Sequence, residues 1–168
     1  MDIAEAIKTA IGFEERITEI YKEYAERFKS ETGAKVFRTL GKEEEEHVDY
    51  LKLKLSEWEE SGKIRLDAID SVVPDEKVIK TNIDQLKNIA SQDNIDDEIE
   101  YFQKALEMEK KTSSFYRDMV SQLSSEYQPL FQRFLEIEEA HESIVKAEID
   151  HARGMGFWFD FMEFDQEA

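Results

Sequence analysis

Two segments, separated by about half the length of the chain, carry the same residues at the same spacings. Each segment has a glutamate followed seven residues later by a tyrosine, and a second glutamate followed three residues later by a histidine. These residues are Glu14, Tyr21, Glu44 and His47 in the first segment and Glu109, Tyr116, Glu138 and His141 in the second. We therefore interpret the chain as a duplicated helix pair, in which each copy supplies one glutamate from its first helix and a Glu/His pair from its second.

The composition favours an all-α fold. The 168 residues include only two prolines and six glycines, and long stretches combine strong helix formers with apolar residues three and four positions apart. Such spacing forms the buried seam of a packed helix. In each of four predicted helices the seam turns polar about halfway along. The polar residues on the four seams are Glu14; Glu44 and His47; Glu109; and Glu138 and His141.

Capping residues and breaks predict where the helices begin and end. The first helix is expected over 2–30, with Asp2 as its N-cap, and a turn at 31–33 leads to a second helix that ends at 61, with Gly62 as its C-cap. The third helix is expected over 93–123. A link at 124–125 joins it to a fourth helix, which ends at the break at 154–156. Residues 62–93 contain a proline and are too long for a tight turn, so we expect a crossover with some helix around 76–90. Two short links around one long crossover predict a four-helix bundle whose second and third helices run parallel.

We expect two parts in the chain: the bundle over residues 1–154 and an aromatic tail over residues 155–168. The tail alternates Phe157, Phe159 and Phe161. An exposed segment this apolar would be a liability. We therefore expect the tail to pack on the bundle or on a second subunit, and we favour a homodimer.

The six polar residues at one depth of an apolar core need compensation. An uncompensated buried carboxylate costs several kcal/mol, and four carboxylates close together also repel one another. Protonation would relieve the repulsion. Two divalent cations would relieve it more completely, because their charge balances four carboxylates while the histidines stay neutral. We therefore predict a dinuclear metal site, with a metal-free buried polar network as the alternative.

Other polar residues near these positions have simpler interpretations. Tyr21 and Tyr116 are either core aromatic residues or hydrogen-bond donors to a ligand carboxylate across the bundle. Within the glutamate run 43–46, the three residues other than Glu44 are expected to form a solvated face. His151 is interpreted as the C-terminal residue of a helix, where a positive charge suits the helix dipole.

The charge and the absence of cysteine exclude several classes of function. A formal net charge of -18 would repel nucleic acid and anionic membranes. The sequence contains no cysteine, which excludes disulfides, thiolate metal sites and a rubredoxin-type iron module within this chain. No apolar run is long enough to span a membrane, and the N-terminus lacks the pattern of a secretory signal. We expect a cytoplasmic protein.

The chain resembles the ferritin-like superfamily, and within it the rubrerythrin branch, over roughly residues 3–153 without the crossover. The motifs that carry this resemblance are Ala-x-x-x-Glu-x6-Tyr, twice, and Glu-x-x-His, twice. They are formed by Ala10, Glu14 and Tyr21; Ala105, Glu109 and Tyr116; Glu44 and His47; and Glu138 and His141. The resemblance implies a ferritin-like four-helix bundle that holds two iron ions. It implies that Glu44 and Glu138 bridge the metals, that Glu14 and Glu109 are terminal ligands, and that His47 and His141 bind one metal each.

The sequence departs from the usual rubrerythrin pattern at two points. The family usually has an additional carboxylate three residues after Glu109, where this chain has Thr112. It also usually carries a cysteine-bound iron module that delivers electrons. Because this chain has none, an electron donor would be external, such as a rubredoxin-like protein.

The resemblance implies an oxidoreductase that reacts with hydrogen peroxide or dioxygen, of the peroxidase or ferroxidase type, with the four glutamates as the catalytic ligands. Three alternatives stay open. The protein could be an iron-storage subunit, which predicts a large hollow assembly. It could hold manganese in the same cradle, as a dimanganese catalase does, because oxygen-rich ligation suits both metals. It could also be a metal-free helical interaction module, whose melting temperature would not respond to metal.

Overall fold

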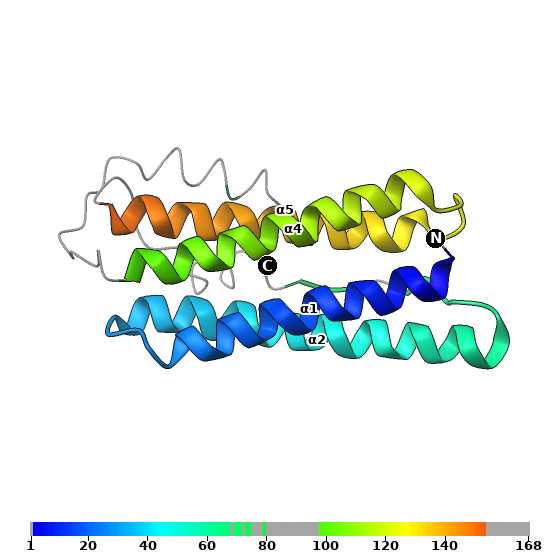
Figure 1. Cartoon of the computed structure of the whole chain (residues 1–168), viewed down its shortest axis with the longest axis horizontal. Coiled ribbons are helices and arrows are strands. Elements are labelled where there is room, and N and C mark those ends of the chain that lie inside the picture. Colours follow the sequence, from blue (N-terminus) through cyan, green and yellow to red (C-terminus); the bar gives the residue numbers. More distant parts are fainter. Residues whose placement is uncertain (1, 68, 72, 75–78, 80–97, 154–168) are drawn as a thin grey trace.

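The computed structural model describes residues 2–67, 69–71, 73–74, 79 and 98–153. The helices in these ranges are α1 (Ile3–Ala25), α2 (Glu31–Ser61), α4 (Ile99–Gln122) and α5 (Gln128–Ala152). Helices α1 and α2 form one antiparallel hairpin, and α4 and α5 form a second hairpin that faces the first (Figure 1). Helices α2 and α4 run in the same direction (Figure 1). The prediction of an all-α four-helix bundle with a long connection between its second and third helices is confirmed.

Local sequence explains most of the helix ends. Asp2 and Glu5 form a capping box at the start of α1, and Gly62 ends α2 with a left-handed φ of 68°, which glycine adopts without steric cost. The expected junction of the first two helices is wrong. Helix α1 stops at Ala25, and residues 31–33, expected to be a turn, are the first turn of α2. The side chain of Ser30 accepts a hydrogen bond from the backbone N–H of Gly33, so serine capping overrides the glycine signal.

Three expectations fall wholly or mainly outside the described residues. They concern the start of the third helix near 93–94, the crossover helix around 76–90, of which only Ile79 is described, and the aromatic tail at 155–168. At the other end of the second hairpin, α4 ends at Gln122, close to the expected limit, and α5 ends at Ala152, just before the predicted break.

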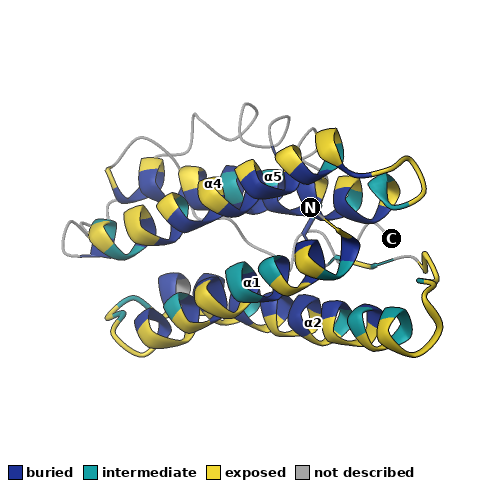
Figure 2. Ribbon diagram, turned by 45° about the vertical axis from the view of Figure 1, so that its right-hand side comes forward, coloured by how far each residue is buried: buried dark blue, intermediate teal, exposed yellow. Residues whose placement is uncertain are grey.

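The core consists of two apolar clusters with a polar layer between them. One cluster contains Tyr21, Phe37 and Phe102, and the other contains Leu51 and Phe131. Buried surface lines the facing sides of the helices, whereas exposed residues cover their outer sides (Figure 2). The glutamates and histidines of the duplicated motif therefore lie in the middle of the bundle, with apolar packing above and below them.

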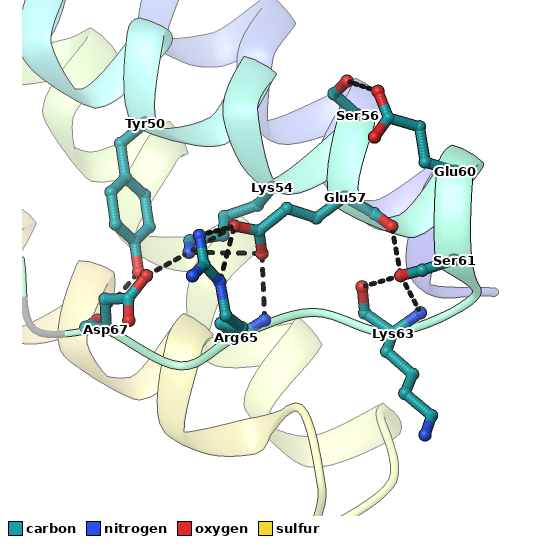
Figure 3. Close-up of polar contacts among 9 residues, drawn as sticks. All are labelled: Tyr50, Lys54, Ser56, Glu57, Glu60, Ser61, Lys63, Arg65 and Asp67. Atoms are coloured by element: carbon teal, nitrogen blue, oxygen red, sulfur yellow. Dashed lines mark hydrogen bonds and ion pairs between the residues drawn. The ribbon is translucent and has the colours of Figure 1, made fainter.

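The first part of the crossover is fastened along α2 by a buried lysine (Figure 3). The Nζ of Lys54, whose side chain is fully buried, lies 2.7 Å from Asp67 Oδ2 and 3.4 Å from Glu57. The Tyr50 hydroxyl donates to the backbone carbonyl of Asp67 at 2.9 Å. Further along the crossover, Arg133 on α5 donates to the carbonyl of Ile69 at 3.2 Å. The crossover thus contacts both hairpins.

A buried glutamate joins the two hairpins at the start of α4. Glu98 Oε1 accepts hydrogen bonds from the backbone N–H groups of Lys29 at 2.6 Å and Ser30 at 3.0 Å. These two N–H groups belong to the link between α1 and α2, where a negative charge suits the N-terminus of α2. None of the helices in the described part of the chain has an apolar stretch that could cross a lipid bilayer.

Candidate metal centre

The six polar residues of the duplicated motif meet at the centre of the bundle. Each is at most 1% exposed. Their potential ligand atoms form two groups, within each of which all the atoms lie within 4.8 Å of one another. The first group is Glu14, Glu44, His47 and Glu138, and the second is Glu44, Glu109, Glu138 and His141. Glu44 and Glu138 belong to both groups, so the arrangement has two adjacent positions that share two carboxylates.

Glu44 lies between the two imidazole rings. The Nδ1 atom of His47 is 2.9 Å from Glu44 Oε2, and the Nδ1 atom of His141 is 2.7 Å from Glu44 Oε1. The two rings are nearly parallel, with an interplanar angle of 12° and centroids 5.8 Å apart. Glu and His three residues apart share one helix face, so the Glu-x-x-His spacing on α2 and α5 directs these groups to the same level.

The two tyrosines form a reciprocal pair of hydrogen bonds across the bundle. Tyr21 on α1 donates its hydroxyl hydrogen to Glu109 on α4. Tyr116 on α4 donates to Glu14 on α1. Both tyrosines are fully buried. Each hydroxyl therefore fixes the carboxylate contributed by the other hairpin, while each ring also packs in an apolar cluster.

The electrostatics of the six residues show how strongly they interact in the metal-free protein. Burial, together with the charge of Glu44, raises the pKa of Glu14 to about 8. Burial and the other glutamates raise the pKa of Glu138 well above its ordinary value. Burial would lower the pKa of His47, but the neighbouring Glu44 carboxylate outweighs burial and raises it to about 10. Protons therefore neutralise much of the carboxylate charge in the absence of cations.

The pKa values of the other three residues of the layer also depend on the balance between burial and neighbouring charges. Burial raises the pKa of Glu109 to about 7, against the opposing charge of His141. Burial would also raise the pKa of Glu44, but both histidine rings outweigh it, and its pKa lies below the ordinary range. The pKa of His141 is raised well above its ordinary value, because Glu44 and other carboxylates outweigh burial.

Several ligand atoms in this layer have no hydrogen-bond partner among the described residues. They are Glu14 Oε2, Glu109 Oε2 and both carboxylate oxygens of Glu138. Buried polar atoms without partners are costly and rare in folded proteins. Carboxylate oxygens with a minority of imidazole nitrogens are donors that suit iron and manganese. The residues present therefore fit a dinuclear metal centre.

The comparison with known proteins agrees with this geometry. The family model described as Rubrerythrin matches residues 5–149. The chain belongs to the rubrerythrin family. No curated protein and no solved structure matches it. The resemblance of the duplicated motifs to rubrerythrins is thus confirmed over most of the chain.

The rubrerythrin-family pattern has its additional carboxylate where this chain has Thr112, and the threonine does not replace it. Thr112 is fully buried, and its hydroxyl donates to the backbone carbonyl of Met108 at 3.1 Å. Thr112 is absent from both ligand groups in the described ranges. Within the described residues, the two groups therefore offer four glutamates and two histidines as potential ligands.

The expectation that Glu43 belongs to a solvated face is wrong. Glu43 is 3% exposed, whereas Glu45 and Glu46 are exposed as expected. Burial alone would raise the pKa of Glu43, but the His141 ring and the nearby Ser71 hydroxyl outweigh burial and lower it. The sequence does contain a signal for this burial. The alternating four- and three-residue spacing of a buried seam is seen at Val36, Leu40, Glu43 and His47.

His151 occupies the last turn of α5, as predicted. Its side chain is nevertheless 1% exposed, so it is a buried residue and not a surface cap. It belongs to neither group of ligand atoms found in the described residues.

Proposed function

We propose that this chain is a non-haem di-iron oxidoreductase that reduces hydrogen peroxide with electrons from an external donor. The observation that carries the proposal is the pair of adjacent ligand groups that share Glu44 and Glu138. Membership of the rubrerythrin family supports the same reaction class. Dioxygen is the alternative oxidant, in which case the activity is of the ferroxidase type.

The proposed ligand roles follow from the shared and unshared members of the two groups. Glu44 and Glu138 would bridge the two ions. Glu14 and His47 would complete one position, and Glu109 and His141 would complete the other. These six residues provide no thiolate, and the charge of the four carboxylates balances two divalent ions.

When bound, two ferrous ions supply the two electrons that, with two protons, convert one peroxide molecule into two water molecules. The chain's own residues hold and orient the carboxylates and protons. Glu14 has a pKa of about 8 in the metal-free protein, so its carboxyl can hold a proton near neutral pH when it is not bound to a cation. The Tyr116 hydroxyl fixes this carboxyl by donating to it. The two apolar clusters exclude bulk water above and below the polar layer.

The electron donor and the subunit arrangement are further parts of the proposal. A rubredoxin-like protein would provide the electrons, because these 168 residues include no cysteine for an iron–sulfur or thiolate iron centre. The aromatic tail would join two copies into a homodimer. Analytical ultracentrifugation of the full chain, with and without residues 155–168, tests this second part. A dimer that persists unchanged without the tail would exclude the tail as its contact.

The test of the metal centre is elemental analysis of the purified protein and of the Glu44→Ala/Glu138→Ala variant after anaerobic reconstitution with ferrous iron. We expect about two iron ions per chain in the unaltered protein and fewer than one in the variant. The matched control is Glu46→Ala/Glu136→Ala, which removes exposed glutamates from the same two helices and should keep both ions. Mixing the ferrous protein with peroxide should oxidise it at a rate that depends on peroxide concentration. An unaltered protein that binds no metal would overturn the proposal. Two manganese ions in the purified protein would mean that the centre holds manganese and not iron.

A further inference from the structure

Glu43 lies on the side of His141 that faces away from the centre. The Nδ1 atom of His141 is 2.7 Å from Glu44 Oε1, whereas its Nε2 atom is 3.6 Å from Glu43 Oε2. Two consecutive glutamates of α2 thus contact opposite edges of one imidazole ring. Glu43 is buried, and neither of its carboxylate oxygens has a hydrogen bond within the described residues.

Among the residues that the structure describes, the other histidine has no such neighbour. Glu43 stands directly before Glu44, and the equivalent residue directly before Glu138 is Ile137, which is 3% exposed and apolar. The Nε2 atom of His47 makes no hydrogen bond in the part of the chain that the structure describes. Its ring instead packs edge-on against Phe134, with centroids 5.3 Å apart. The two halves of the centre therefore differ in what lies behind each histidine.

This difference has a known effect on metal ligands. A histidine that binds a metal through one nitrogen commonly donates its other N–H to a carboxylate, which fixes the tautomer and the ring orientation and makes the ligand more basic. If His141 binds a metal through Nδ1, which faces the centre, its remaining hydrogen would lie on Nε2 and face Glu43. The separation of 3.6 Å is a few tenths of an ångström beyond a hydrogen bond, so a small rotation of either side chain closes it.

Glu43 is 3% exposed and lies near Ser71 of the crossover, so its contact with His141 is kept away from water. The crossover beside it is fastened by Val73, which packs in an apolar cluster, and by the hydrogen bond from Arg133 to Ile69. In such a buried environment a charge-assisted hydrogen bond is stronger than in water.

We propose that Glu43 is a positioning residue for His141 and that it makes the two metal positions unequal, with the position at His141 binding more tightly than the position at His47. This inference rests on the proposed dinuclear centre, and it adds an order of filling and a residue responsible for that order. In the apo-protein, the first equivalent of metal goes to the group of Glu44, Glu109, Glu138 and His141.

The test is a cobalt(II) titration of the metal-free full chain in the presence of a competing chelator, followed by visible absorption. We expect two separate binding steps in the unaltered protein. Glu43→Ala should weaken the tighter step by about 10- to 100-fold and change the other step by less than about threefold. Glu43→Gln keeps an acceptor oxygen and should recover part of the loss. Glu46→Gln, an exposed residue of the same run, is the matched control and should change neither step.

A second measurement separates positioning from a general packing effect. In the cobalt-loaded protein, proton NMR in normal and heavy water should show one shifted, exchangeable N–H signal from His141, which moves or exchanges faster in Glu43→Gln. Equal binding steps in the unaltered protein, equal weakening of both steps by Glu43→Ala, or an unchanged N–H signal would each overturn the inference and leave the dinuclear centre intact. Failure of the unaltered protein to bind cobalt or ferrous iron would instead overturn the proposed function.

Discussion

Tyr21 on α1 donates a hydrogen bond to Glu109 on α4, the helix of the other hairpin. The equivalent Tyr116 returns the same contact to Glu14 on α1. Each glutamate of this pair is therefore held by a residue from the opposite half of the chain. The polar layer and the packing of the two hairpins depend on one another for this reason.

We predict that Tyr21→Phe destabilises the metal-free protein by about 1 kcal/mol, because Glu109 loses the donor to one of its buried oxygens. Tyr116→Phe should have a similar effect through Glu14. Urea unfolding followed by circular dichroism, in the presence of a chelator, measures both changes. A pair of variants as stable as the unaltered protein would show that these hydrogen bonds contribute nothing to the association of the hairpins.

Metal binding should release protons. At pH 7 the metal-free layer holds protons on Glu14 and His47, whose pKa values are raised to about 8 and about 10, and the raised pKa values of Glu138 and His141 favour their protonated forms as well. Metal ligands must be deprotonated, so filling both positions should release two or more protons per chain. Titration of a weakly buffered solution with ferrous or cobalt ions and a pH indicator dye measures the number. A release near zero would contradict the raised pKa values.

The metal-free protein should lose stability as the pH rises. The pKa of Glu14 increases from 4.5 to about 8 on folding, and that of His47 from 6.5 to about 10. Their protonated forms therefore stabilise the folded state fully below the unfolded values, and this contribution is lost as the pH rises through the folded values. Glu44 acts in the opposite sense, because its lowered pKa gives stability that is present above 4.5 and lost in acid.

We therefore expect the melting temperature with chelator present to be several degrees higher at about pH 6 than at about pH 9. Differential scanning fluorimetry measures this difference. Glu14→Gln removes one of the titrating groups and should reduce the slope. A melting temperature that rises over the same interval would contradict the assignment of protons to this layer.

Alanine substitutions at two glycines of the first hairpin should change the stability of the protein in opposite directions. Among the described residues, a Cβ atom at Gly12 would meet only the Arg16 guanidinium, at 3.7 Å, whereas at Gly41 it would lie 3.0 Å from the Cβ of Tyr21. Gly12→Ala should stabilise the protein by about 0.5–1 kcal/mol through helix propensity. Gly41→Ala gains the same propensity but separates α1 from α2 beside Tyr21, at a cost of about 1–3 kcal/mol. Chemical denaturation of both variants measures the difference, and equal stabilisation would show that the close approach at Gly41 is not needed.

The sequence predicts the level of the polar layer well because the seam positions depend only on helical spacing. Glu14 and Glu44 are central on their seams, and the bundle topology follows from one long and two short connections. The sequence offered a hydrogen bond across the bundle as one of two interpretations of the tyrosines, and the structure was needed to choose between them and to identify each partner. Seven residues of helix separate Tyr21 from Glu14 by about 10 Å along the axis, so the tyrosine's partner had to come from another helix, and only the packing of α1 against α4 identifies it.

Two details were missed because two local signals competed. Gly33 suggested a turn, but Ser30 caps a helix that begins before it. The run 43–46 suggested a solvated face because four consecutive acids are costly to bury. The actual helix face of Glu43 is defined by Leu40 and His47, and the buried carboxylate is tolerated because it lies beside an imidazole.

The long connection between the hairpins has an evolutionary consequence. A bundle assembled from two separate, identical hairpins would carry every substitution twice, once on each side of its symmetry axis. Here one continuous chain encodes both halves, so each copy of the repeat is free to diverge. Glu43 of the first copy corresponds to Ile137 of the second. Lys54, which anchors the crossover, corresponds to Glu148. Covalent linkage thus allows a nearly symmetric scaffold to hold an asymmetric centre.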